Sequence, residues 1–194
     1  MKIAGLQKLS TIDYPEHLSA VVFTNGCNYN CWYCHNRQLI DSTAKNIPTN
    51  EILEFLYKRK IHLRGVVISG GEPVLQDDLP DFIKQLKQMG YLVKLDTNGS
   101  KPAMVERCLD MLDYVAIDYK APEKLYNKIC SIADYEYVKK SLFLLGQSTV
   151  RWEVRTTLVP EVAEAADQLI SEIKNMDFKN KPEKYRFNDY RKLR

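Results

Sequence analysis

The sequence predicts an α/β protein in which parallel strands alternate with helices packed outside them. The first observation is that short β-branched runs alternate with amphipathic helical patterns from residue 18 almost to the end of the 194 residues, as successive βαβ units do. The second is that polar residues follow several of these runs at the same end, where α/β folds gather their active sites. Right-handed crossovers then give an open doubly wound sheet or an incomplete (β/α) barrel, and periodicity alone does not separate the two.

Each expected strand is a short run rich in β-branched and other apolar residues. In chain order, the strands are expected at residues 18–24, 65–69, 91–97, 114–118, 151–159 and 184–188. Helices are expected between them because apolar residues recur three and four positions apart. These helical patterns fall at residues 52–57, 82–89, 105–112, 138–145 and 169–173.

Composition limits the partners and the compartment. The chain has 28 Lys and Arg against 25 Asp and Glu, a net charge of +3, which is too small to indicate a nucleic acid or an anionic membrane as the main partner. Basic runs at residues 58–64 and 186–194 are interpreted as solvated surface. The N-terminus lacks the apolar region of a signal peptide, and no run approaches the roughly 18 apolar residues of a membrane span. We therefore expect one domain over residues 1–194, in the cytoplasm.

Three of the five cysteines lie close together with the spacing C-x3-C-x2-C, at Cys27, Cys31 and Cys34. A short loop can aim three thiolates at one centre and leave a fourth position for another ligand or a substrate. Three interpretations follow: an iron–sulfur cluster, a Cys3His zinc site with His35, and a thioredoxin-like pair of Cys31 and Cys34. The zinc site would be strained because residues 34 and 35 are consecutive, and the redox pair leaves Cys27 unexplained.

Polar residues stand just past four of the expected strands. Because the carboxyl ends of parallel strands share one edge of a sheet, these side chains are expected to converge. The four groups are Asn25-Gly26-Cys27, Gly70-Gly71-Glu72, Asp96-Thr97-Asn98-Gly99 and Asp118-Tyr119-Lys120.

Two motifs resemble those of the radical S-adenosylmethionine (SAM) superfamily. The cysteine motif has an aromatic residue before its last cysteine, in the order Cys31-Trp32-Tyr33-Cys34, and GGEP stands intact at residues 70–73. The resemblance implies a partial (β/α)6 barrel of the TIM type, with parallel strands and outer helices. It also implies one [4Fe–4S] cluster on Cys27, Cys31 and Cys34, and SAM bound at the iron without a protein ligand. Beyond the cluster and SAM, no catalytic side chain is implied.

A closer resemblance is to the activases of glycyl radical enzymes. The opening GLQKLSTIDYPEHLSAVVFTNGC is similar to that of the anaerobic ribonucleotide reductase activating proteins. CHN at residues 34–36, LDTNG at 95–99, D-x-K at 118–120 and RTTLVP at 155–160 are similar to motifs of pyruvate formate-lyase activase. The resemblance weakens after residue 160. No ferredoxin-like cysteine cluster is present, and Cys108 and Cys130 are expected to be buried structural thiols.

The resemblance also implies roles for the residues of the site. A SAM pocket is implied at Tyr33, His35, Gly70, Gly71, Glu72, Asp96, Asp118, Lys120 and Arg155. A monovalent cation is implied beside SAM, on Asp96, Thr97 and Asp118. Plainer interpretations stay open: a core aromatic for Tyr33, a strand-to-helix turn for the two glycines, turn chemistry for Asp96 and a solvated surface for Lys120 and Arg155.

The implied reaction is reductive cleavage of SAM to methionine and a 5′-deoxyadenosyl radical, which takes a hydrogen atom from a glycine α-carbon of a partner enzyme. The resemblance favours an anaerobic ribonucleoside-triphosphate reductase as that partner, with a low-potential electron donor such as flavodoxin or ferredoxin. The alternatives are another glycyl radical enzyme of the pyruvate formate-lyase type, a radical SAM enzyme acting on a small molecule or peptide, and a non-enzymatic zinc-binding module.

Overall fold

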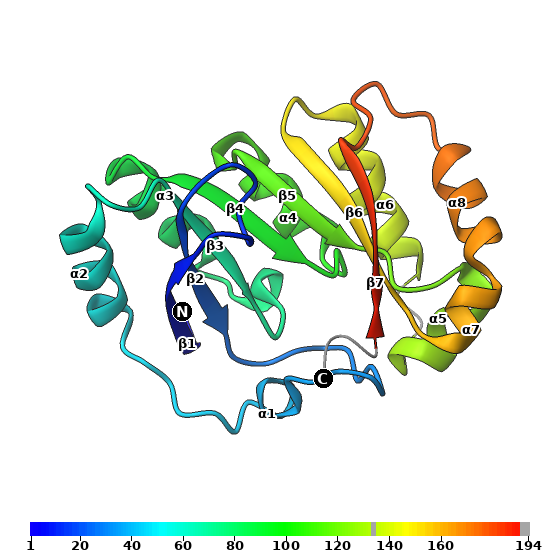
Figure 1. Ribbon diagram of the computed structural model, residues 1–194, viewed down its shortest axis with the longest axis horizontal. Helices are drawn as coiled ribbons and strands as arrows, with labels where there is room; N and C mark the ends of the chain where they lie inside the picture. The colour runs from blue at the N-terminus through cyan, green and yellow to red at the C-terminus, as the bar shows by residue number, and fades with distance from the viewer. Residues whose placement is uncertain (133–134, 191–194) are drawn as a thin grey trace.

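The computed structural model describes residues 1–132 and 135–190 and contains one seven-stranded sheet, in the spatial order β1 to β7. Strand β1 (Ile3–Ser10) pairs antiparallel with β2 (Ser19–Thr24), and the remaining neighbours pair in parallel. The later strands are β3 (Gly65–Gly70), β4 (Leu92–Thr97), β5 (Tyr114–Asp118), β6 (Arg151–Leu158) and β7 (Lys184–Asp189). Figure 1 shows the sheet curved into an open partial barrel with helices around its outside.

The six parallel strands predicted from the sequence are confirmed as β2 to β7, each within one residue of the expected bounds. Strand β1 was not predicted. Its burial does not alternate, because three residues in a row are half-buried and the next three are exposed, so the period of two that marks a half-buried strand is missing. Pairing with β2 covers an edge of the sheet that would otherwise be open.

The five predicted helical patterns are confirmed as α2 (Thr49–Arg59), α3 (Leu79–Gln88), α4 (Pro102–Cys108), α6 (Tyr135–Gln147) and α8 (Ala166–Lys174). Three further helices were not predicted from the sequence: α1 (Arg37–Ile40), α5 (Glu123–Cys130) and α7 (Pro160–Glu164). Two 3-10 turns, at Pro73–Leu75 and Leu109–Met111, complete the connections. The loop after β2 and helix α1 pass beneath the carboxyl ends of the strands in Figure 1.

Successive residues of the middle strands face opposite sides of the sheet, as the pleat requires. In β4, Val93 and Leu95 belong to the main hydrophobic core, whereas Lys94 and Asp96 face the interior of the barrel. Strand β6 repeats this pattern, with Trp152 and Val154 in the core and the charged Glu153 and Arg155 on the other side, whereas β5 adds only Asp118 to the charged side. The barrel interior is therefore charged toward the carboxyl ends of these strands, and the helices pack against the outer face.

The amino end of the barrel interior is closed by Tyr14, from the loop between β1 and β2. Tyr14 packs with Val21, Val67 and Tyr114 in a small separate cluster of buried residues, with the two tyrosine ring centroids 6.3 Å apart. Gly65 makes room for this ring, since a Cβ there would lie 2.7 Å from it. Tyr14 thus fills the amino end of the interior.

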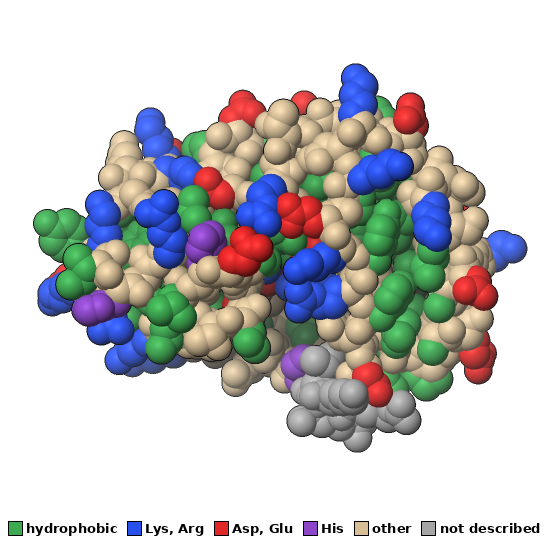
Figure 2. Space-filling view, turned by 45° about the horizontal axis from the view of Figure 1, so that its top comes forward, with side chains coloured by type: hydrophobic (Ala, Val, Ile, Leu, Met, Phe, Trp, Pro, Cys, Tyr) green, Lys and Arg blue, Asp and Glu red, His purple; other side chains and the backbone are tan. Residues whose placement is uncertain are grey.

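The surface carries charges of both signs. Figure 2 shows Lys and Arg side chains interspersed with Asp and Glu on one face, without a broad field of a single sign. Within the described part of the chain, no helix has the length and hydropathy needed to cross a bilayer. Of the C-terminal basic run, Arg191, Lys192 and Arg194 lie outside the described residues.

Candidate active site

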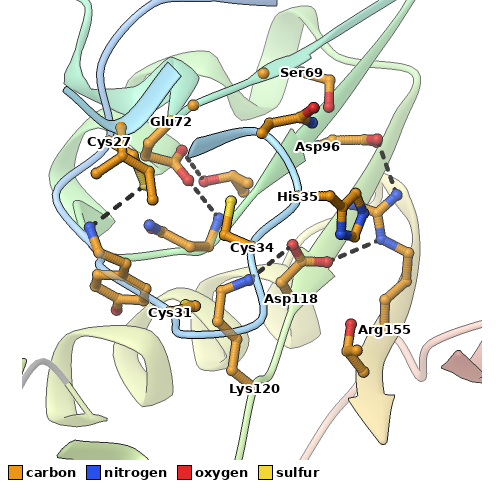
Figure 3. Close-up of a pocket in the computed structure, with 18 of the residues that line it drawn as sticks. Cys27, Cys31, Cys34, His35, Ser69, Glu72, Asp96, Asp118, Lys120 and Arg155 are labelled. Carbon is orange, nitrogen blue, oxygen red and sulfur yellow. Dashed lines mark hydrogen bonds and ion pairs between the residues drawn. The ribbon is translucent and has the colours of Figure 1, made fainter. Parts of the chain in front are cut away.

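A cavity of about 250 Å³ opens at the carboxyl ends of the strands, and it collects every site residue expected from the sequence. Figure 3 shows these side chains arranged around it, from the loop after β2 on one side to β6 on the other. The expected residues that line it are Cys27, Cys31, Tyr33, Cys34, His35, Gly70, Gly71, Glu72, Asp96, Thr97, Asp118, Lys120 and Arg155.

The three cysteines lie on an irregular loop over residues 25–36, which forms neither helix nor strand. Its start is fixed where the Asn25 amide donates to the Lys2 carbonyl at 2.9 Å and the Gly26 amide donates to the Leu39 carbonyl at 2.7 Å. Inside the loop, the Cys34 amide donates to the Cys31 carbonyl at 3.0 Å, which closes a tight turn between two of the cysteines. The loop is therefore anchored at its ends and free of regular structure where the thiols lie.

The thiols sit in different electrostatic surroundings. Burial and the nearby Glu72 raise the pKa of Cys27 to about 12. A hydrogen bond from the Cys130 thiol, assisted by Lys120, lowers the pKa of Cys31 to about 6. In the described ranges, no three His, Cys, Asp or Glu side chains are already spaced to hold a metal ion.

The donor set nevertheless fits an iron–sulfur cluster. Three thiols of one irregular loop line the same cavity, so all three face the space that a cluster would occupy. Thiolates are the ligands such clusters take, and binding would release the proton that burial holds on Cys27. His35 is exposed and also lines the cavity.

Cys130 was expected to be an inert buried thiol, and it is buried, but its sulfur contacts Cys31. The two chain segments also meet through the backbone, where the Asn30 amide donates to the Cys130 carbonyl at 3.0 Å. Helix α5 thereby supports the middle of the cysteine loop. No sequence pattern could indicate this contact, because residues 31 and 130 are joined only by the fold.

The glycines of GGEP allow the end of β3 to pack directly against the loop that leads to Cys27. Gly70 has φ of +119°, and a Cβ at Gly71 would lie 2.1 Å from the Gly26 carbonyl oxygen. The Gly71 amide donates to the Thr24 carbonyl and the Glu72 amide to the Gly26 carbonyl, at 2.9 and 2.8 Å. Only residues without a side chain allow this approach.

Glu72 joins the loop after β3 to the loop after β4. Its carboxylate accepts bonds from the Thr97 hydroxyl at 2.6 Å, the Asn98 amide at 2.7 Å and the Val74 amide at 3.1 Å. Burial raises the pKa of Glu72 to about 7 despite these bonds. The side chain thus fixes two strand-end loops relative to each other at the wall of the cavity.

Arg155 bridges the two strand-end aspartates. Its Nη1 donates to Asp96 Oδ2 at 2.9 Å and its Nε donates to Asp118 Oδ1 at 3.0 Å. Lys94 and Lys120 bond the second oxygen of each carboxylate, at 2.5 and 3.2 Å. Burial alone would raise the pKa of both aspartates, but the neighbouring cations hold each below its usual value. Because three cations face two carboxylates, the group carries one surplus positive charge.

Lys94 was not expected from the sequence as part of this group. A lysine inside a strand reads as a solvent-facing residue, yet its side chain is only 2% exposed. The signal that could have found it is position: it stands two residues before Asp96, so both face the barrel interior. Tyr33 is half-buried and packs edge-to-face with Trp32, with ring centroids 5.7 Å apart.

Comparison with known proteins gives a family match along most of the chain. The family model described as the radical SAM superfamily matches residues 21–173. A Methanocaldococcus jannaschii protein that bears the name of a glycyl-radical enzyme activating enzyme is 38% identical, over 85% of this chain and 71% of its own length. The pyruvate formate-lyase 1-activating enzyme of Escherichia coli K12 is 24% identical, over 82% of this chain and 68% of its length.

A solved structure shows the same fold. SuiB of Streptococcus suis, bound to the precursor peptide SuiA, superposes with a TM-score of 0.66 at 15% identity. The match covers 88% of this chain and 38% of that chain. At that identity, the likeness concerns the arrangement of strands and helices alone.

Proposed function

The chain belongs to the radical SAM superfamily, with named activases of glycyl radical enzymes among its relatives, and from this premise we propose that it reductively cleaves SAM to generate a glycyl radical on a partner enzyme. The observation that carries the proposal is the joint lining of one cavity by the three motif cysteines and the charged strand ends. Three cysteines without a neighbouring polar pocket would not support the proposal, and neither would a polar pocket without the cysteines.

Cys27, Cys31 and Cys34 would hold the [4Fe–4S] cluster that the family implies, leaving one iron without a protein ligand. When bound, the cluster supplies the electron that breaks the sulfonium bond of SAM. The residues of this chain would provide the thiolates, hold the loop at its ends and support its middle through the Cys130 carbonyl of helix α5. Their task is to position the two cofactors and exclude water.

The wall of the cavity opposite the cysteine loop suits the methionine end of SAM. The surplus positive charge among Lys94, Lys120 and Arg155 would favour a carboxylate in the cavity. Arg155 uses two of its five N–H donors on Asp96 and Asp118, so others are left for an anion. Tyr33 and His35 line the cysteine side, where an adenine ring would stack or bond.

The favoured partner is an anaerobic ribonucleoside-triphosphate reductase, because the first residues of the chain resemble its activating proteins. A pyruvate formate-lyase type partner has equal support from the named relatives. In either case a flavodoxin or ferredoxin would deliver the electron. The partner would present a glycine on a segment that reaches SAM through the open side of the partial barrel.

Anaerobic reconstitution with iron and sulfide tests the proposal. The full chain is expected to become brown, to bind iron and sulfide, and to convert SAM to 5′-deoxyadenosine and methionine when reduced. Addition of a glycyl radical enzyme should then produce the doublet of a glycyl radical by electron paramagnetic resonance. The two candidate partner classes, tested in parallel, decide which is activated.

Two results would contradict the proposal at different levels. A colourless protein with stoichiometric zinc would exclude the cluster and indicate a zinc-binding module. A brown protein that cleaves SAM but produces no radical on any glycyl radical enzyme would indicate a radical SAM enzyme with a small-molecule or peptide substrate.

A further inference from the structure

The three side chains expected to hold a monovalent cation already have protein partners. Each of the four carboxylate oxygens of Asp96 and Asp118 accepts a bond from a side-chain cation, at 2.5 to 3.2 Å. The Thr97 hydroxyl donates to Glu72 at 2.6 Å and accepts from the Gly99 amide at 3.0 Å. A dissolved cation bound to these oxygens would lie against the charges of Lys94, Lys120 and Arg155, and their repulsion opposes it, so this donor set does not suit a further cation.

Lys94 is the unusual member of the group, because it reaches Asp96 from behind the cavity. Its side chain is 2% exposed, and its ammonium lies 5.9 Å from the centre of the Tyr114 ring, on the closed side of the barrel. Arg155 and Lys120 approach the aspartates from the cavity wall, which both of them line. Lys94 therefore leaves the cavity face of the group open to a ligand.

Lys94 and Asp96 are both buried, so each charge needs the other to offset the free-energy cost of its burial. A buried ammonium or carboxylate without a partner is costly, and removing one member of a buried pair leaves the other charge uncompensated. Lys94 Nζ lies 2.5 Å from Asp96 Oδ1, and its single positive charge equals that of a monovalent metal ion. Tethered to β4, it is present whatever the salt composition.

We propose that Lys94 is a built-in counter-ion that replaces the dissolved monovalent cation beside SAM, so that SAM binding by this chain does not depend on K⁺ or Na⁺. Lys94 is a positioning residue: it holds Asp96, Asp96 holds Arg155, and Arg155 faces the cavity. The inference rests on the proposed function for the identity of the ligand. The charge pair itself is independent of that function.

Cation exchange at constant ionic strength tests the proposal. Wild type and Lys94→Ala are compared in KCl, NaCl and choline chloride, because a bulky organic cation cannot enter a buried site. The first measurement is the unfolding temperature of the full chain without reconstitution. The second is the rate of SAM cleavage by the reconstituted enzyme as a function of K⁺ concentration.

Wild type is expected to show the same unfolding temperature and the same SAM cleavage in all three salts. Lys94→Ala opens space beside Asp96, and K⁺ is expected to raise its unfolding temperature by roughly 5 °C at saturation. Its SAM cleavage should become saturable in K⁺, with a loss of roughly tenfold or more in choline. Lys87→Ala is the matched control, since Lys87 pairs with Asp113 where both side chains are about a third exposed; no K⁺ effect is expected there.

A K⁺ requirement in wild type, or a Lys94→Ala variant that responds equally to all three cations, would overturn the proposal. If Lys94→Ala does not fold, Lys94→Ser, whose short side chain also leaves space beside Asp96, takes its place with the same expected K⁺ dependence. A reconstituted wild type that cleaves no SAM would overturn the proposed function, while the unfolding temperatures would still decide the role of Lys94.

Discussion

The two ends of the barrel interior are built from different interactions. At the amino end, Tyr14 fills the space between Val67 and Tyr114 with apolar contacts. At the carboxyl end, charged side chains bond one another around a cavity, and an irregular loop with three thiols forms the remaining wall. One end thus contributes packing that is complete without a ligand, whereas the other is assembled from groups that suit a ligand.

The largest expected effect concerns the loop at the open end. Cys31→Ala removes one of three thiolates, so bound iron and SAM cleavage are expected to be lost entirely after reconstitution. Iron and sulfide analysis, with the visible spectrum, measures this. Cys108→Ala is the matched control, because Cys108 is fully buried in α4 outside the cavity lining, and it should retain the cluster. Equal iron content in Cys31→Ala and Cys108→Ala would contradict the role of the cysteine loop as the ligand site at the carboxyl end.

The next effect concerns the charged wall. Arg155→Met leaves each aspartate with a single lysine and removes two charge-assisted hydrogen bonds, each contributing about 1.5–3 kcal/mol, so the free energy of unfolding is expected to fall by about 3–5 kcal/mol. Urea denaturation of the full chain measures it. Arg155→Lys should recover part of the loss, since one ammonium cannot reproduce a guanidinium that bonds both aspartates. A loss well under about 1 kcal/mol for Arg155→Met would show that the wall is not held together by this bridge.

At the closed end, Tyr14→Ala is expected to lower the free energy of unfolding by about 3 kcal/mol, because it removes a buried ring and leaves a void. Iron content and SAM cleavage should be unchanged at temperatures where the variant is folded. Tyr14→Phe keeps the ring and should cost less than about 1 kcal/mol. If Tyr14→Ala abolished SAM cleavage in a folded protein, the two ends would have to be treated as coupled.

A smaller effect is expected from the ionisation of Glu72. Its pKa is raised from 4.5 to about 7, mainly by burial, so between these values the folded chain keeps a proton that the unfolded chain releases. The stabilisation is complete below pH 4.5 and is lost as pH rises to about 7, a decrease of at most about 3 kcal/mol. Urea denaturation of the full chain across this range should show that decrease, and Glu72→Gln should flatten it. Glu106→Gln, an exposed control, should retain the wild-type slope.

Sequence reasoning was most successful where one local pattern determines the outcome. Strand β5 was predicted at its observed bounds, and the convergence of Glu72, Asp96 and Asp118 follows from their places at the ends of parallel strands. Strand β1 was missed because its burial lacks a clear alternation. The short helix α5 was missed as well, although eight residues suffice there to support the cysteine loop.

What could not be predicted depends on contacts between distant segments. The hydrogen bond between Cys130 and Cys31 joins α5 to the loop after β2. Lys94 was overlooked because lysine in a strand usually indicates solvent, and only the curvature of the sheet makes that face an interior. The metal, the cofactor and the role of each lining residue stay predictions from the motifs, since geometry alone does not identify a ligand.

The close approach of Gly71 to the Gly26 carbonyl has a consequence for the thiol loop. Cys27 follows Gly26 directly, so the position of the first thiol depends on how closely the ends of β2 and β3 approach, in addition to the bonds that the Asn25 and Gly26 amides donate. The distance between the ends of β2 and β3 thus sets the position of the Cys27 thiol. A methyl group at Gly71 would force the Gly26 carbonyl away from β3. The displacement would affect Cys27, the next residue, before the other two cysteines.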